Sequence, residues 1–151
     1  MMKKILMAAL ALMLLCSCGT KEKAPYTLAD ADAIVNSGAF EGSDMAPIDS
    51  MIVSILYGIE ESTISECAGY MATNTSVSAD ELVVLILMDE NAAIAAEEAC
   101  KARVAAQIAV CETYAPAAVS RLENALIRRR ANTVLLVVGD PDIISTLNDL
   151  H

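Results

Sequence analysis

The run Leu-Val-Val-Leu-Ile-Leu-Met at residues 82–88 contains seven apolar side chains in succession and no polar one. Successive side chains of a strand point to opposite faces of a sheet, so an uninterrupted run is typical of a strand that is buried on both faces. The segment at residues 133–138, Thr-Val-Leu-Leu-Val-Val, has the same character. We therefore expect two buried strands with the rest of a sheet built around them.

Strand and helix patterns surround these two segments. The elements expected after residue 60 are, in chain order, strands at 62–73 and 82–88, a long alanine-rich helix from its cap Asp89 to about Tyr114, a short helical turn from Pro116, strands at 125–129 and 133–138 joined about residues 130–132, and a closing helix from Pro141 to near Leu150. Two short helices are expected before them, at residues 28–36 and 47–58. The caps Thr27, Asp89 and Asp140 and the helix-ending Gly and Pro residues support these boundaries.

The order ββ-α-ββ-α predicts an α+β domain. We expect an antiparallel sheet of about four strands, in two hairpins, with the long helix and the C-terminal helix packed on one face. Strands that are apolar on both faces then leave the second face to be covered. The two N-terminal helices are the favoured cover, because large exposed apolar patches are rare on monomers. The alternative is that a partner covers this face.

The N-terminus has the features of a lipoprotein signal peptide. Lys3 and Lys4 precede an unbroken apolar run of eleven residues, 5–15, which is shorter than the roughly 20 residues of a spanning helix. The run ends at Leu15-Cys16-Ser17-Cys18, which resembles the lipobox of bacterial lipoproteins. Cleavage after the small Ser17 would leave Cys18 to carry a diacylglyceryl anchor. Cys16 is a poorer candidate, because Leu15 before it is bulky; an ordinary secretory leader is the remaining alternative.

These features divide the chain into three parts: a signal peptide at 1–17, the lipidated Cys18 and a polar tether at 18–27, and a single α+β domain at 28–151. The mature chain would have eight basic and twenty acidic residues, a net charge of −12. Such a surface repels nucleic acid and anionic head groups, so we expect no nucleic-acid partner and membrane contact only through the lipid anchor. No Trp, one Phe and four Tyr offer few stacking platforms for sugars or bases.

The remaining cysteines do not suggest a disulfide framework. Cys67, Cys100 and Cys111 are odd in number and widely spaced. Cys100 and Cys111 share one face of the expected long helix but lie about 16 Å apart along its axis, too far for a disulfide. We predict buried free thiols that act as small apolar side chains.

Few residues suggest catalysis or metal binding. The only histidine is His151, the last residue, so no Ser or Cys nucleophile has a histidine base within the body of the chain. No zinc, calcium or phosphate-loop pattern occurs, so we expect neither a metal nor a cofactor. Two carboxylate pairs, 80–81 and 89–90, lie at opposite ends of the 82–88 strand and are interpreted as solvated turn and cap residues. A catalytic pair is the alternative.

Arg128-Arg129-Arg130 is the one basic cluster on an acidic chain. In a strand Arg128 and Arg130 share a face, where they could contact a small anion or an acidic partner. The alternative, which we favour, is a charged hairpin that prevents edge-to-edge pairing of sheets.

The chain resembles a family of small Gram-positive lipoproteins that carry a single domain of unknown function of the DUF4358 type. The residues that carry the resemblance are the lipobox, Tyr57-Gly58-Ile59, Ala79-Asp80-Glu81-Leu82, Tyr114 with Pro116, Leu122-Glu123-Asn124-Ala125, and Asn132 with Val134 to Val138 and Asp140. The family usually has Gly where Ala131 stands and an aromatic residue in place of Thr133. A wider hairpin turn is therefore expected, because Ala adopts a positive φ less easily than Gly. The resemblance implies a surface-anchored domain and no known activity.

These observations predict a lipoprotein on the extracytoplasmic face of the cell membrane. We expect a non-enzymatic domain that binds a protein or peptide at the envelope. The alternative is a small-molecule or anion-binding lipoprotein with Arg128 and Arg130 as contacts. A hydrolase that uses only carboxylates is the least favoured hypothesis.

Overall fold

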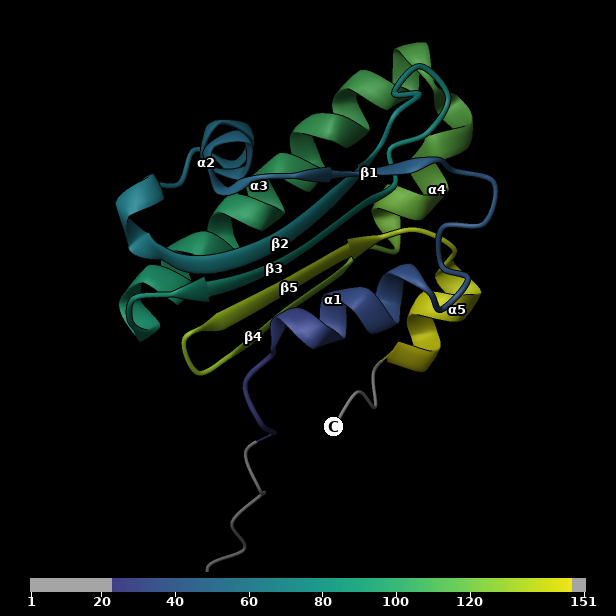
Figure 1. Cartoon of the computed structure of the whole chain (residues 1–151). Helices are drawn as coiled ribbons and strands as arrows, with labels where there is room; N and C mark the ends of the chain where they lie inside the picture. The colour runs from purple at the N-terminus through teal and green to yellow at the C-terminus, as the bar shows by residue number, and fades with distance from the viewer. Residues whose placement is uncertain (1–22, 148–151) are drawn as a thin grey trace, which may run out of the picture.

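The apolar run of the sequence lies at the centre of a five-stranded antiparallel sheet (Figure 1). A computed structural model describes residues 23–147 of the chain. The strands, in the order β1-β2-β3-β5-β4 across the sheet, are β1 (Met45–Ile48), β2 (Ile64–Ala72), β3 (Glu81–Leu87), β5 (Thr133–Val138) and β4 (Leu126–Arg130). The helices within this part of the chain are α1 (Leu28–Val35), α2 (Ser50–Tyr57), α3 (Glu90–Tyr114), α4 (Pro116–Glu123) and α5 (Pro141–Thr146), with a 3-10 turn, η1, at Glu61–Thr63.

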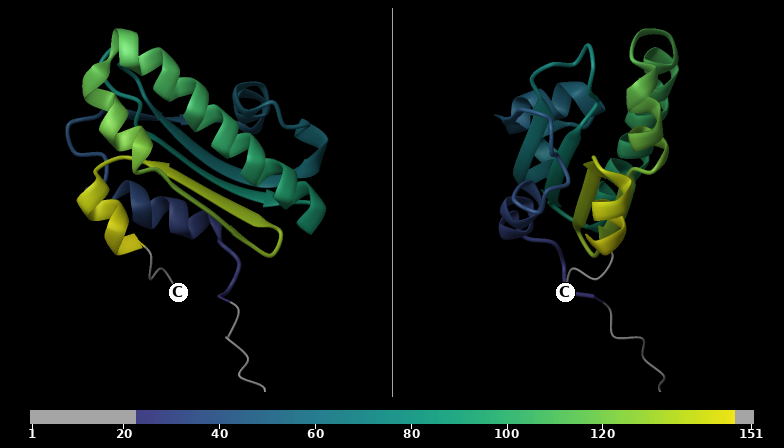
Figure 2. Two further views of the ribbon diagram at one scale, coloured as in Figure 1. Left: turned by 180° about the vertical axis from the view of Figure 1, so that it is seen from behind. Right: turned by 90° about the vertical axis from the view of Figure 1, so that its right-hand side faces the viewer.

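Helices cover both faces of the sheet, and the alternation of β3 explains why. Val83, Leu85 and Leu87 pack into a core with α2, α3 and α4, whereas Leu82 and Val84 pack into a second core with α1 and α5. All five side chains are at most 1% exposed. The sheet is seen between α3 and α1 in the side view of Figure 2. The α+β class and the two buried central strands are thus confirmed.

The predicted placement of the helices was partly wrong. The C-terminal helix was expected beside the long helix, but Ile144 of α5 packs in the core that contains α1. Of the two N-terminal helices, α1 covers the second face as expected, whereas Val53 and Tyr57 of α2 pack against the same face as α3. Strands that are apolar on both sides require cover on both sides, but they do not specify which helix supplies it.

The prediction of four strands missed β1. The sequence pattern predicts no element at Met45 and Ala46 and a helix from Pro47, but Pro47 pairs with Tyr70 at the edge of the sheet. An edge strand tolerates proline because one side of its backbone needs no partner. The helix α2 begins later, where the side chain of Asp49 accepts a hydrogen bond from the backbone N–H of Ile52 at 2.9 Å.

The β4–β5 hairpin is tighter than predicted. Arg130 pairs with Thr133, which leaves only Ala131 and Asn132 in the turn. Ala131 adopts φ 47°, a left-handed conformation that glycine takes without strain. The side chain of Asn132 donates to the carbonyl of Leu87 at 2.8 Å, which holds the turn against the end of β3.

Other predicted boundaries agree with the structure. Thr27 and Asp30 form a capping box at α1, and Asp89 caps α3 through the backbone N–H of Ala92. The expected extension of the last helix beyond residue 147, together with the signal peptide, Cys18 and His151, lies outside the described residues. None of the helices between residues 23 and 147 has the length and hydropathy needed to cross a membrane.

Candidate functional site

A pocket of about 390 Å³ lies between α3 and the segment that leads into β3. Its walls include apolar side chains of α2, β2 and α3, namely Leu56, Met71, Ala106 and Val110. Its polar residues include Asp80, Glu81, Arg103 and Gln107. The pocket is at the end of the sheet opposite the β4–β5 hairpin, because Glu81 pairs with Val138 whereas the other end of β3 meets Asn132.

Glu81 is the most heavily bonded residue of this pocket. Its side chain is only 1% exposed, and Arg103 of α3 binds both carboxylate oxygens, with Nε to Oε1 and Nη2 to Oε2 at 2.8 Å each. The hydroxyl of Tyr57 donates to Oε1, and the amide of Gln107 donates to Oε2 at 3.3 Å. Four donors from two helices therefore occupy both oxygens of Glu81.

The alternation of the sheet places Glu81 in this position. Glu81 is two residues before Val83 and so points to the same face, toward α3. Arg103 and Gln107 are four residues apart on α3 and share a face of that helix. The guanidinium of Arg103 also lies over the Tyr57 ring, 5.0 Å from its centre. A carboxylate buried in an apolar face is thus matched by a cation and two neutral donors.

The surroundings fix the protonation of two members of this network. Burial is the main cause that raises the pKa of Tyr57 well above its usual value, and the charge of Glu81 adds to the effect. Burial by itself lowers the pKa of Arg103, but the hydrogen bonds and charge of Glu81 outweigh it and raise the pKa overall. At neutral pH Tyr57 is therefore a neutral donor and Arg103 a cation.

Asp80 forms a second buried ion pair beside the first. Its side chain is fully buried, and its Oδ2 accepts hydrogen bonds from Arg121 of α4 at 2.5 Å and from the hydroxyl of Ser43 at 2.6 Å. The backbone N–H of Asp80 donates to the hydroxyl of Ser78 at 3.1 Å. The other oxygen, Oδ1, is buried and has no hydrogen-bond partner.

The prediction that residues 80 and 81 are solvated was therefore wrong. Both are 1% exposed. One signal was present in the sequence, because extending the alternation of Val83, Leu85 and Leu87 back by one step places Glu81 on a buried face. By contrast, Asp89 and Glu90 are exposed at the start of α3, as predicted for a cap.

The predicted arginine site lies at the other end of the molecule. Arg128 and Arg130 occupy the same side of β4 as Leu126, whereas Ile127 packs on the α3 side. Arg130 is 9% exposed, and its guanidinium lies 4.2 Å from the centre of the Tyr26 ring and donates to the carbonyl of Ala24 at 3.3 Å. Arg130 therefore secures the segment before α1, while Arg128 is half-buried nearby.

Two of the three thiols, Cys100 and Cys111, agree with the predicted role as buried core side chains. Cys100 and Cys111 are buried in the α3 core, Cys67 is half-buried, and all three are free. Burial is the main cause that raises the pKa of Cys100 to about 12. Such a thiol is a poor nucleophile at neutral pH.

The two buried carboxylates of the pocket are engaged mostly by groups of the same chain. General acid–base chemistry needs a carboxyl group that can exchange a proton with a substrate. In this pocket Glu81 is held on both oxygens and Asp80 on one by groups of the same chain. Across residues 23–147, no three acidic, cysteine or histidine side chains are grouped in a way that would hold a metal ion.

Comparison with known proteins gives the family of the chain. A family model described as a domain of unknown function (DUF4358) matches residues 38–139, about two thirds of the chain. The chain belongs to this family. The DUF4358 match contains all five strands, α2, α3, α4 and the pocket with both buried ion pairs, whereas α1 and α5 lie outside it. Neither a curated protein nor a solved structure matches the chain.

Proposed function

We propose that this DUF4358 protein is a non-enzymatic binding domain, held on the extracytoplasmic face of the cell membrane by a lipid on Cys18. The observation that carries the binding role is the pocket beside Asp80 and Glu81, whose carboxylates are engaged by Arg121 and Arg103. A pocket of about 390 Å³ lies within the usual range for small ligands, which is about 300–1,000 Å³. It is large enough for a small molecule or for one or two residues of a peptide.

The edges of the sheet favour recognition in a pocket over the addition of a partner strand. One edge, β1, is four residues long and contains Pro47. The other edge, β4, carries three successive arginines. Short strands, proline and charge are features that discourage pairing with another strand. A peptide partner would thus enter the pocket rather than extend the sheet.

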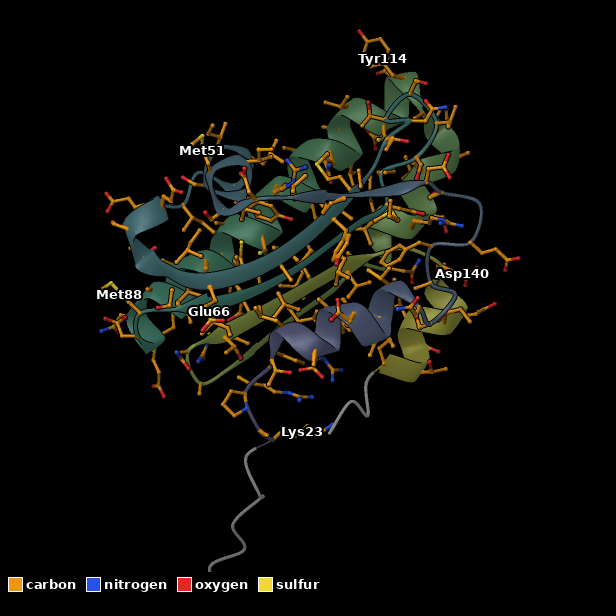
Figure 3. All side chains as sticks on the ribbon, viewed as in Figure 1. Lys23, Met51, Glu66, Met88, Tyr114 and Asp140 are labelled. Carbon is orange, nitrogen blue, oxygen red and sulfur yellow. The ribbon has the colours of Figure 1, made fainter. Side chains whose placement is uncertain are left out.

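The path of the chain near its N-terminus supports an orientation for the anchored domain. The backbone N–H of Tyr26 donates to the hydroxyl of Thr133 at 2.9 Å, and Arg130 stacks on the Tyr26 ring. Lys23 is five positions after Cys18, and five residues of extended chain span at most about 18 Å. A lipid on Cys18 would therefore hold the hairpin end close to the membrane. Lys23 and Tyr114, the last residue of α3, lie at opposite ends of the molecule (Figure 3). The C-terminal half of α3 lines the pocket. The pocket would therefore point away from the bilayer.

A second candidate function is the binding of a small anion near the hairpin. Lys23, Arg128 and Arg129 line a broad hollow of about 860 Å³. Two acidic residues, Glu90 and Glu97, also line it, and Glu97 pairs with Arg129 at 3.2 Å. Titration with inorganic phosphate tests this candidate. Binding that is lost in Arg128→Gln and kept in Gln107→Met, which changes the pocket and not the hollow, would favour the hollow over the pocket.

Metabolic labelling with a radioactive fatty acid tests the anchor. We expect the wild-type chain and a Cys16→Ala variant to carry label and to remain with the membrane. A Cys18→Ala variant should carry none and should leave the membrane fraction. A labelled Cys18→Ala protein, or an unlabelled wild-type protein in the cytosol, would refute the proposed anchor.

A further inference from the structure

The pocket contains acceptors that the chain itself leaves unused. Among residues 23–147, two buried side-chain atoms have no hydrogen-bond partner, Oδ1 of Asp80 and Oε1 of Gln107. Both residues line the same pocket. Buried polar groups in folded proteins are nearly always bonded, to the protein or to ordered water, so each of these atoms has the capacity to accept a hydrogen bond from a group outside the chain.

Each donor group around these two atoms already makes a hydrogen bond within the chain. Arg103 binds Glu81 through Nε and Nη2, Arg121 binds Asp80, and the side-chain amide of Gln107 donates to Glu81. The hydroxyl of Ser43 also donates to Asp80. What the inner part of the pocket offers a ligand is therefore acceptor capacity, beside the apolar side chains of Leu56, Met71 and Val110.

The presence of unused acceptors beside engaged donors favours some polar groups of a ligand over others. A carboxylate or phosphate brings only acceptors, and an amide brings an acceptor that would need a donor of its own. A primary ammonium has three N–H donors and no acceptor. It would also be favoured by the charge of the fully buried Asp80, whose partner Arg121 is 29% exposed and hence partly screened by water.

We propose that the pocket binds a primary amine on a small aliphatic body, with the ammonium donating to Oδ1 of Asp80 and Oε1 of Gln107. This inference rests on the proposed function in one respect, that the pocket is the binding site. The aliphatic part lies against Met71 and Val110. The turn at residues 74–77 is exposed, and Thr75 within it lines the pocket, so a ligand would enter past this turn.

The test is an NMR titration of the mature chain, kept with its anchor in detergent micelles, with two probes of the same aliphatic shape. The first is 3-methylbutylamine and the second is 3-methylbutanoate. We expect the amine to shift the amide signals of Met71, Ser78 and Val110 in a saturable way, with a dissociation constant in the millimolar range. The acid should bind at least tenfold more weakly.

A matched pair of variants locates the contact. Gln107→Met removes the acceptor, together with the amide group that donates to Glu81, from a half-buried helix position and should weaken the amine about tenfold. Ala105→Met introduces the same side chain at an exposed position of the same helix that does not line the pocket, and it should leave the affinity unchanged. An unchanged affinity in Gln107→Met would overturn the assigned contact.

The outcomes separate the ligand class from the proposed function. If the acid binds in the pocket as tightly as the amine, the ammonium assignment is wrong while the pocket remains a binding site. If neither probe shifts the pocket signals, the ligand class is overturned, and crosslinking at the pocket in cells then tests the binding role separately.

Discussion

Removing the positive partner of Glu81 should strongly destabilise the domain. In Arg103→Met the helix and the apolar stem are kept, but the carboxylate, 1% exposed, loses its bidentate cation. Breaking a buried pair by deleting one partner typically costs about 3–5 kcal/mol, because the remaining charge is buried without compensation. Arg103 is itself only 11% exposed, so little of this loss is restored by water. We expect a decrease in the free energy of unfolding of about 4 kcal/mol.

Urea denaturation of the mature chain at pH 7, followed by circular dichroism, measures this effect. With a urea dependence of about 2 kcal/mol/M, a loss of about 4 kcal/mol lowers the midpoint by about 2 M. The control is Lys101→Met, which removes an exposed cation of the same helix and should leave the midpoint nearly unchanged, because ion pairs at the surface contribute little to stability. The double variant Glu81→Met/Arg103→Met removes both buried charges and should recover part of the loss. If Arg103→Met and Lys101→Met unfold at the same urea concentration, the buried pair does not stabilise the fold as argued.

Three further predictions concern the turn, the tyrosine and the thiols. Ala131→Gly should raise the free energy of unfolding by about 0.5–1 kcal/mol because φ 47° suits glycine, and a lower midpoint in urea would contradict this. Burial raises the pKa of Tyr57, so above about pH 10 the folded state keeps a proton that the unfolded state releases. The free energy of unfolding should therefore fall as the pH rises beyond about 10. The fall should be less steep in Tyr57→Phe, which has no such proton. Equal slopes for the two proteins would refute the assignment. Iodoacetamide at pH 8 should modify half-buried Cys67 before Cys100, whose pKa is about 12, and mass spectrometry showing the reverse order would contradict the burial of Cys100.

The sequence was most informative where the hydrophobic pattern was strongest. The uninterrupted apolar character of 82–88 and 133–138 predicted strands buried on both faces, and these are β3 and β5. The caps Thr27 and Asp89 predicted the starts of α1 and α3. In each case the signal is local, because it depends on residues within a few positions of one another.

Features that depend on distant residues were missed. β1 has only four residues, which are too few to show the alternation typical of a strand. Its strand conformation is stabilised by pairing with β2, which lies elsewhere in the sequence. The side of the sheet occupied by α5 follows from the direction in which the chain leaves β5, which the apolar pattern does not encode. The burial of Asp80 and Glu81 depends on arginines that are 41 and 22 residues away in the sequence. Alternation could have placed Glu81 inside, but only the fold identifies its partner.

The central claim, that the pocket captures a ligand outside the cell, is tested most directly by crosslinking in living cells. In the test protein a photo-crosslinking amino acid replaces Val110, which lines the pocket and is 57% exposed. In the control protein it replaces Ile94, which is 49% exposed on the same helix but does not line the pocket. We predict that mass spectrometry detects a discrete adduct on the position 110 protein that is absent from the position 94 protein, and that Gln107→Met reduces it. Identical adduct patterns at the two positions, or no adduct at position 110, would contradict the account.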